Sequence, residues 1–143
     1  MKDMTRFATG AGVIALGALT ALAPRVGLLQ VCEYAGKQTM DGHHMPCWYT
    51  ARTSLILGIL IGIIGIVIVI AKNLTLLRMA TAALGIAAIV VVLTPTAFNP
   101  ICKNPDMPCN QGIKPLLIVI GIVAFGLAVW IAISSRTDKQ ISA

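Results

Sequence analysis

Four long apolar stretches without a single ionisable residue set the hydrophobic pattern of the chain. They cover residues 7–23, 53–71, 79–98 and 115–133. At 1.5 Å of rise per residue, helices of this length reach about 26 to 30 Å, the thickness of the hydrocarbon core of a bilayer. Inside hydrocarbon every backbone N–H and C=O group needs a partner within its own segment, so even runs rich in Ile and Val are expected to be helical. The pattern predicts an all-α fold, an integral membrane four-helix bundle that forms one membrane domain over residues 1–143.

The composition excludes several classes of protein. Of the 143 residues, 57% are hydrophobic and 11% are charged, whereas soluble domains contain roughly 45–50% and about 25%. The mean hydropathy is +0.89. A chain with so few polar residues is neither a soluble enzyme domain nor a disordered tail.

The first apolar stretch has some features of a secretory signal peptide. Lys2 and Arg6 precede it, and the Ala-Leu-Ala sequence at residues 21–23 resembles a cleavage site. However, the stretch is longer than the roughly 7–15 apolar residues of a signal peptide, and Pro24 would follow the cut, where its ring hinders a peptidase. We therefore expect residues 1–23 to be retained as the first span.

Basic residues indicate the orientation of the four spans. An even number of spans puts both termini on one side, in short segments that contain Lys2, Arg6, Lys72, Arg78, Arg136 and Lys139. The opposite side consists of two longer loops, at about residues 24–52 and 99–114, that contain Arg25, Lys37, Arg52, Lys103 and Lys114. By the positive-inside rule, the denser side is cytoplasmic, which predicts an N-in and C-in protein of a bacterial inner or plasma membrane. Topology and anionic lipid account for the net charge of +6, and no nucleic-acid partner is predicted.

All four cysteines lie in the two predicted outer loops. They are Cys32 and Cys47 in the first loop and Cys102 and Cys109 in the second. An even number of cysteines on the oxidising side of a membrane is typical of disulfides. Of the three connectivities, we favour Cys32–Cys47 and Cys102–Cys109, because each bond closes its own loop.

The first outer loop also gathers soft metal ligands. Within a few residues it contains Met40, His43, His44 and Met45. Thioether and imidazole groups together suit Cu(I), and Zn²⁺ is a less soft alternative. The spacing matches no established ligand motif, so a polar loop without metal stays the alternative interpretation.

Aromatic and basic side chains near the ends of the spans predict anchors at the membrane surface. Trp48, Tyr49 and Arg52 lie where the second span meets the outer surface, and Trp130 lies near the inner end of the fourth. Amphipathic rings favour the headgroup level, and an Arg side chain there can extend to lipid phosphates.

The spans lack the ionisable residues that mark ion paths, proton relays and substrate sites inside membranes. This absence argues against a transporter, pump or channel acting alone and against catalysis within the bilayer, and no catalytic residue is predicted. The spans contain small residues at a spacing of four instead, which allow close helix contact within the bundle or with a partner. These are Gly58 and Gly62 in the second span, Ala83 and Ala87 in the third, and Ala124, Ala128 and Ala132 in the fourth, while Gly10, Gly12 and Gly17 give the first span a similarly smooth surface.

Two short motifs carry a family resemblance that extends over nearly the whole chain. They are Met-Pro-Cys-Trp-Tyr-Thr-Ala at residues 45–51 and Asn-Pro-Asp-Met-Pro-Cys-Asn at residues 104–110. With these motifs the chain resembles domain of unknown function 4418, a family of small bacterial membrane proteins with four spans. The resemblance implies an accessory subunit, because such genes often lie beside ABC transporters for lipoprotein or macrolide export. Where the family commonly has His after the first-loop cysteine, this chain has Trp48, which weakens any metal or haem role based on a Cys-His pair.

The layout is also similar to that of quinone-linked membrane thiol oxidases. Those proteins have four spans, a cysteine pair in each outer loop and an Arg near the quinone, a place that Arg52 would take here. Their first loop uses a Cys-x-x-Cys motif, in which close spacing lowers a thiol pKa. Cys32 and Cys47 are much further apart, so the active motif is missing.

These observations lead to one main hypothesis and two alternatives. We expect a non-catalytic membrane subunit without a cofactor that assembles with a larger complex, an ABC-type exporter, or with further copies of itself. The first alternative is a copper- or zinc-binding protein of the outer face. The second is a quinone-linked thiol-disulfide oxidoreductase.

Overall fold

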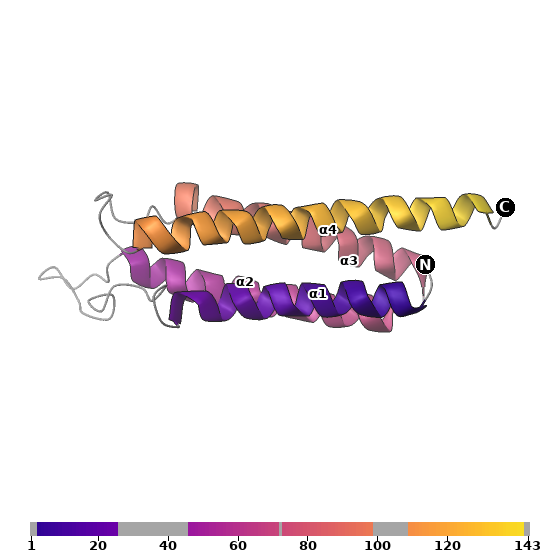
Figure 1. Ribbon diagram of the computed structural model, residues 1–143, viewed down its shortest axis with the longest axis horizontal. Helices are drawn as coiled ribbons and strands as arrows, with labels where there is room; N and C mark the ends of the chain where they lie inside the picture. Colours follow the sequence, from indigo (N-terminus) through magenta and orange to yellow (C-terminus); the bar gives the residue numbers. More distant parts are fainter. Residues whose placement is uncertain (1–2, 26–45, 72, 99–108, 142–143) are drawn as a thin grey trace, which may run out of the picture.

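The computed structural model describes residues 3–25, 46–71, 73–98 and 109–141, and the regular structure within these ranges is helical. Four long helices form an antiparallel bundle, α1 (Asp3–Leu22), α2 (Pro46–Ile70), α3 (Leu74–Leu93) and α4 (Lys114–Ile141) (Figure 1). Shorter helical segments are η1 (Ala23–Arg25), η3 (Thr94–Phe98) and η4 (Cys109–Ile113). All four long helices are long and apolar enough to cross a membrane. The predicted all-α fold with four helices of membrane-spanning length is therefore confirmed.

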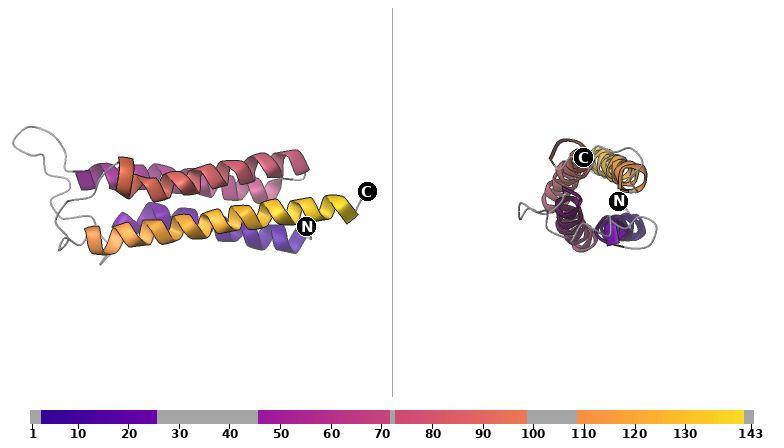
Figure 2. Two further views of the ribbon diagram at one scale, coloured as in Figure 1. Left: turned by 90° about the horizontal axis from the view of Figure 1, so that it is seen from above. Right: turned by 90° about the vertical axis from the view of Figure 1, so that its left-hand side faces the viewer.

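The bundle is built from two helical hairpins. Helix α1 packs most extensively on α2, and α3 packs most extensively on α4. The hairpins meet through α2 with α3 and, less extensively, α1 with α4, so the end view shows the helices in a ring (Figure 2). The start of α1 and the end of α4 lie at the same end of the bundle, and we call this the terminal end (Figure 1).

The helices extend beyond the charge-free stretches that the sequence delimits. Helix α2 begins at Pro46, well before residue 53, and α4 continues to Ile141, well past residue 133. Charged residues are excluded from hydrocarbon but not from helices, so a helix continues into the headgroup region after its apolar stretch ends. Residues 46–52, expected in an outer loop, consequently belong to α2.

Prolines mark several helix boundaries. Pro46 is the first residue of α2, where its missing N–H is not needed and its fixed φ favours the helix. At the other end of α3, Pro95 cannot donate to the carbonyl of Val91, and the chain widens into the π-helical segment η3. Thr94 still donates its backbone N–H to the Val90 carbonyl at this transition.

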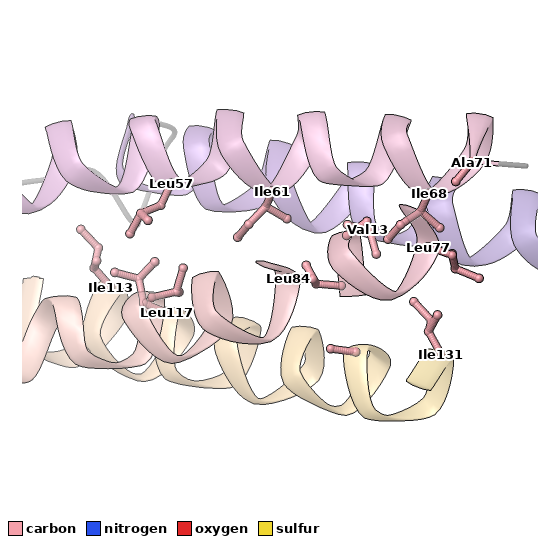
Figure 3. Close-up of a cluster of buried hydrophobic side chains, with 13 residues drawn as sticks. Val13, Leu57, Ile61, Ile68, Ala71, Leu77, Leu84, Ile113, Leu117 and Ile131 are labelled. Atoms are coloured by element: carbon pink, nitrogen blue, oxygen red, sulfur yellow. The ribbon is translucent and has the colours of Figure 1, made fainter. Parts of the chain in front are cut away.

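The core lies between the two hairpins. Its largest fully buried side chains include Ile61 and Ile68 of α2, Leu84 of α3 and Leu117 of α4. Figure 3 shows Leu57 and Ile61 pointing from α2 toward the α3–α4 hairpin. Only 28–33% of each membrane-length segment is buried, and the exposed faces are also apolar. A helix that is hydrophobic all round suits a lipid environment.

Candidate functional site

The closest backbone approach in the bundle joins α1 and α2 at paired glycines. A Cβ atom on Gly17 would lie 2.7 Å from the carbonyl oxygen of Gly58. A Cβ atom on Gly65 would lie 3.1 Å from the carbonyl oxygen of Gly10. At Gly17 a side chain would collide with backbone atoms, so the hairpin requires glycine there, and at Gly65 a side chain would be tightly packed.

Both glycines of the predicted α2 motif, Gly58 and Gly62, pack against Gly17. A Cβ atom on Gly17 would lie 2.7 Å from the backbone nitrogen of Gly62, whereas a Cβ atom on Gly62 itself would point into open space, as would one on Gly12. A further contact residue of α2 is Gly65, which the sequence pattern did not predict. Gly10 and Gly17 of α1, like Gly58 and Gly65 of α2, are seven residues apart. Residues at this heptad spacing lie on one face toward a neighbouring helix, so the spacing could have indicated Gly65 as a contact residue.

Small residues also line the contact between α3 and α4. A Cβ atom on Gly121 would lie 3.0 Å from the carbonyl oxygen of Ala88. Ala124 and Ala128, both predicted, are buried, at 1% and 5% exposure. Gly121 also belongs to this contact, but it was not among the small residues that the sequence predicted to pack.

Two predicted small residues, Ala83 and Ala132, lie away from the buried faces of α3 and α4. Both are exposed, whereas the predicted Ala87 is half-buried and packs against the core. The face that α3 buries runs through Leu77, Leu84 and Val91 and carries Ala80 and Ala88 instead. A rotation of the helix about its axis decides which alanines face inward, and large buried side chains set that rotation.

The outward face of α1 carries a row of alanines. Ala8, Ala11, Ala15 and Ala18 are all exposed, at successive spacings of three, four and three. Helical residues three and four apart lie on one face, so the four form a continuous stripe, which we call the α1 alanine stripe. Its surface is smooth because methyl groups project little beyond the backbone.

Aromatic and basic residues cluster at the other end of the bundle, near the start of α2. The rings of Trp48 and Tyr49 meet edge to face, with centroids 5.2 Å apart. The guanidinium of Arg52 lies 5.2 Å from the centroid of the Trp48 ring, within cation–π range. At the terminal end, Trp130 on α4 is 64% exposed.

Several buried hydroxyl groups donate hydrogen bonds to carbonyls of their own helices. Thr20 donates to the Leu16 carbonyl at 2.7 Å, and Ser54 donates to the Ala51 carbonyl at 3.0 Å. Such back-bonding removes the cost of burying a hydroxyl proton without a partner. These hydroxyls are thus explained by local bonding and do not require a polar path.

Comparison with known proteins places the chain in a family. The sequence model of a domain of unknown function, DUF4418, matches residues 13–133. The chain belongs to the DUF4418 family. No curated protein and no solved structure matches it.

The DUF4418 match confirms the resemblance that the two loop motifs indicated. It contains the contact glycines Gly17, Gly58, Gly65 and Gly121, whereas Gly10 lies before it. The packing within both hairpins thus falls inside the family region.

The predicted cysteine and metal-ligand positions of this DUF4418 protein fall mostly outside the described residues. This applies to Cys32, Cys102, Met40, His43, His44 and Met45. Cys47 is the second residue of α2, and Cys109 is the first residue of η4. Within the described ranges, no group of three His, Cys, Asp or Glu residues is arranged to hold a metal ion.

Proposed function

We propose that this protein is a non-catalytic membrane subunit that assembles with a larger membrane complex, an ABC-type exporter. The observation that carries the proposal is the α1 alanine stripe, an exposed small-residue face on a helix whose other side is already packed against α2. The expected association of such genes with exporter genes supports the choice of partner.

Helices associate in a bilayer for a different reason than in water. Lipid tails are as apolar as Leu side chains, so apolar surface alone does not hold helices together in a bilayer. Small residues do favour association, because they let two backbones approach and gain dispersion contacts. The contact glycines are used inside the bundle, whereas Ala11 and Ala15 face outward and are available to a partner helix.

We further infer an N-in and C-in orientation in a bacterial plasma membrane, with both outer loops closed by disulfides. The supporting observations are the density of basic residues beside the termini and the confinement of all four cysteines to the opposite side. In this arrangement the Trp48–Arg52 cluster anchors α2 at the outer surface.

Crosslinking in native membranes tests the proposal. A photo-crosslinking amino acid at Ala15 should give a covalent adduct with another membrane protein, identified by mass spectrometry as an exporter subunit. The control position is Ile86, which is 65% exposed on α3, away from the stripe. Adducts only between copies of this chain, or equal adducts from both positions, would reject the proposed partner surface.

A bulky substitution provides a second measurement. Ala15→Leu should lower the amount of partner that co-purifies in mild detergent by roughly tenfold, since overpacking a close contact costs about 1–3 kcal/mol. Ala83→Leu, at an exposed alanine of α3, is the matched control and should leave co-purification unchanged. A lone monomer from wild-type membranes would contradict the proposal.

A further inference from the structure

A groove of about 470 Å³ lies between α3 and α4 near the terminal end of the bundle. Arg78, Thr81 and Gly85 line it from α3, and Phe125, Ala132 and Ser135 line it from α4. The groove exists because Gly85 and Ala132 are too small to fill the space between the helices. Its volume lies within the range of roughly 300 to 1,000 Å³ that is usual for ligand sites.

The groove is polar at one end and apolar at the other. Arg78 is exposed at its mouth, beside the buried hydroxyls of Thr81 and Ser135. Both hydroxyls donate to their own helices, Thr81 to the Leu77 carbonyl and Ser135 to the Ala132 carbonyl at 2.9 Å. The hydroxyl oxygens can still accept hydrogen bonds. Arg78 is the lining residue that supplies a positively charged hydrogen-bond donor.

A second hollow of about 280 Å³ continues between the same two helices beyond Phe125, which lines both hollows. Its lining is wholly apolar and includes Ala88, Val92 and Gly121. From Arg78 to Val92 the helix rises by about 21 Å. This exceeds the depth of one leaflet, which is half of the roughly 30 Å hydrocarbon core. Together the two hollows have the dimensions and polarity profile of an amphiphile with a charged head and a long tail.

The charge at the mouth favours an anionic head. Arg78 lies in the second turn of α3, and helical side chains lean toward the N-terminus of their helix. The first turn of α3 has free backbone N–H groups, and its N-cap residue Asn73 makes no side-chain cap hydrogen bond. An Arg side chain beside an uncapped helix N-terminus is suited to a phosphate group.

We propose that this groove binds an anionic phospholipid from the leaflet at the terminal end of the bundle. The phosphate contacts Arg78 and the first turn of α3, and one acyl chain follows Gly85 past Phe125 into the apolar hollow. Basic pockets between transmembrane helices are known to hold such headgroups. A partner helix is a poorer fit, because the 46% exposed Phe125 ring interrupts the path, and a flexible chain bends around it more readily than a rigid cylinder. The site is independent of the proposed assembly with an exporter.

Native mass spectrometry of the full chain tests the charge requirement. Protein in mild detergent is titrated with phosphatidylglycerol or with phosphatidylcholine of the same acyl composition. Phosphatidylglycerol should bind with about tenfold higher affinity than phosphatidylcholine. Arg78→Gln should lower phosphatidylglycerol affinity about tenfold, as expected for the loss of one hydrogen bond to a charged group. The control Arg25→Gln removes an exposed charge at the opposite end and should have no effect. Equal losses from both variants, or equal binding of the two lipids, would overturn the proposal.

A second pair of variants tests the acyl path. Ala82→Leu places a larger side chain in the groove, whereas Ala83→Leu places the same side chain at the adjacent exposed position, which does not line it. Only Ala82→Leu should weaken phosphatidylglycerol binding, with helix content by circular dichroism unchanged in both variants. Inorganic phosphate should not displace the lipid at equal concentration, because it lacks the tail. Displacement by phosphate, or equal effects of the two alanine variants, would refute a lipid groove.

Discussion

Gly17 of α1 and Gly58 of α2 pack so closely that neither position has room for a side chain. A Cβ atom on Gly17 would lie 2.7 Å from the Gly58 carbonyl oxygen, and one on Gly58 would lie 2.6 Å from the Gly17 carbonyl oxygen. Both distances are shorter than real Cβ atoms tolerate. The contact therefore sets how closely α1 and α2 approach.

The first prediction is that alanine at either glycine destabilises the protein. In Gly17→Ala or Gly58→Ala, the added methyl group meets backbone atoms that have no rotamer by which to move aside. We expect a loss of roughly 1–3 kcal/mol in the free energy of unfolding, the usual cost of overpacking. Thermal unfolding in detergent, followed by circular dichroism, measures the change.

Matched controls exist on both helices. Gly12 and Gly62 have open space where a Cβ atom would lie. Because alanine is the better helix former by about 1 kcal/mol, Gly12→Ala and Gly62→Ala should leave stability unchanged or raise it. If Gly17→Ala and Gly62→Ala unfold at the same temperature, the glycine contact does not limit the hairpin.

The sequence predicted the four spans because one constraint dominates them. Hydrocarbon offers no hydrogen-bond partner, so any charge-free run of this length must become a helix. The helix ends were less accessible, since residues 46–52 and the last turns of α4 are polar enough for a loop and yet helical. No property of single residues distinguishes a helix that ends at the hydrocarbon boundary from one that continues into water.

The helix faces were harder still to predict. Spacing identifies residues that share a face, but it does not reveal the rotation of a helix about its axis or its shift along its partner. This is why Gly58 and Gly62 were predicted in a contact and Gly65 was not, and why Ala83 is exposed. The groove beside Arg78 has no sequence signal of its own, because it is a space between two helices that small residues leave unfilled.

The second prediction concerns the cysteines. Protein purified without reductant should contain Cys32–Cys47 and Cys102–Cys109 disulfides, identified by peptide mapping before and after reduction. Reduction should lower stability by roughly 2–4 kcal/mol for each closed loop. Maleimide labelling of four free thiols in the unreduced protein would show that this assignment is wrong.

The third prediction concerns the metal alternative, which rests on residues 40–45. If the first outer loop binds copper or zinc, protein purified without a metal-affinity tag should contain the metal, and His43→Ala with His44→Ala should remove it. Elemental analysis measures the metal content directly. Only trace metal in the wild-type protein ends this hypothesis, and it leaves the subunit proposal untouched.

The fourth prediction is the orientation of the bundle. Basic residues are denser beside the termini than in the longer loops, and Lys and Arg near span ends are retained on the cytoplasmic side. Green fluorescent protein fused after Ala143 should therefore fluoresce in bacterial cells, whereas alkaline phosphatase at the same position should be inactive, because it needs an oxidising compartment to form its disulfides. The result also fixes the leaflet that faces Arg78, which is the cytoplasmic one in this orientation. An active phosphatase fusion would put the four cysteines in the reducing cytoplasm and would contradict the disulfide prediction together with the orientation.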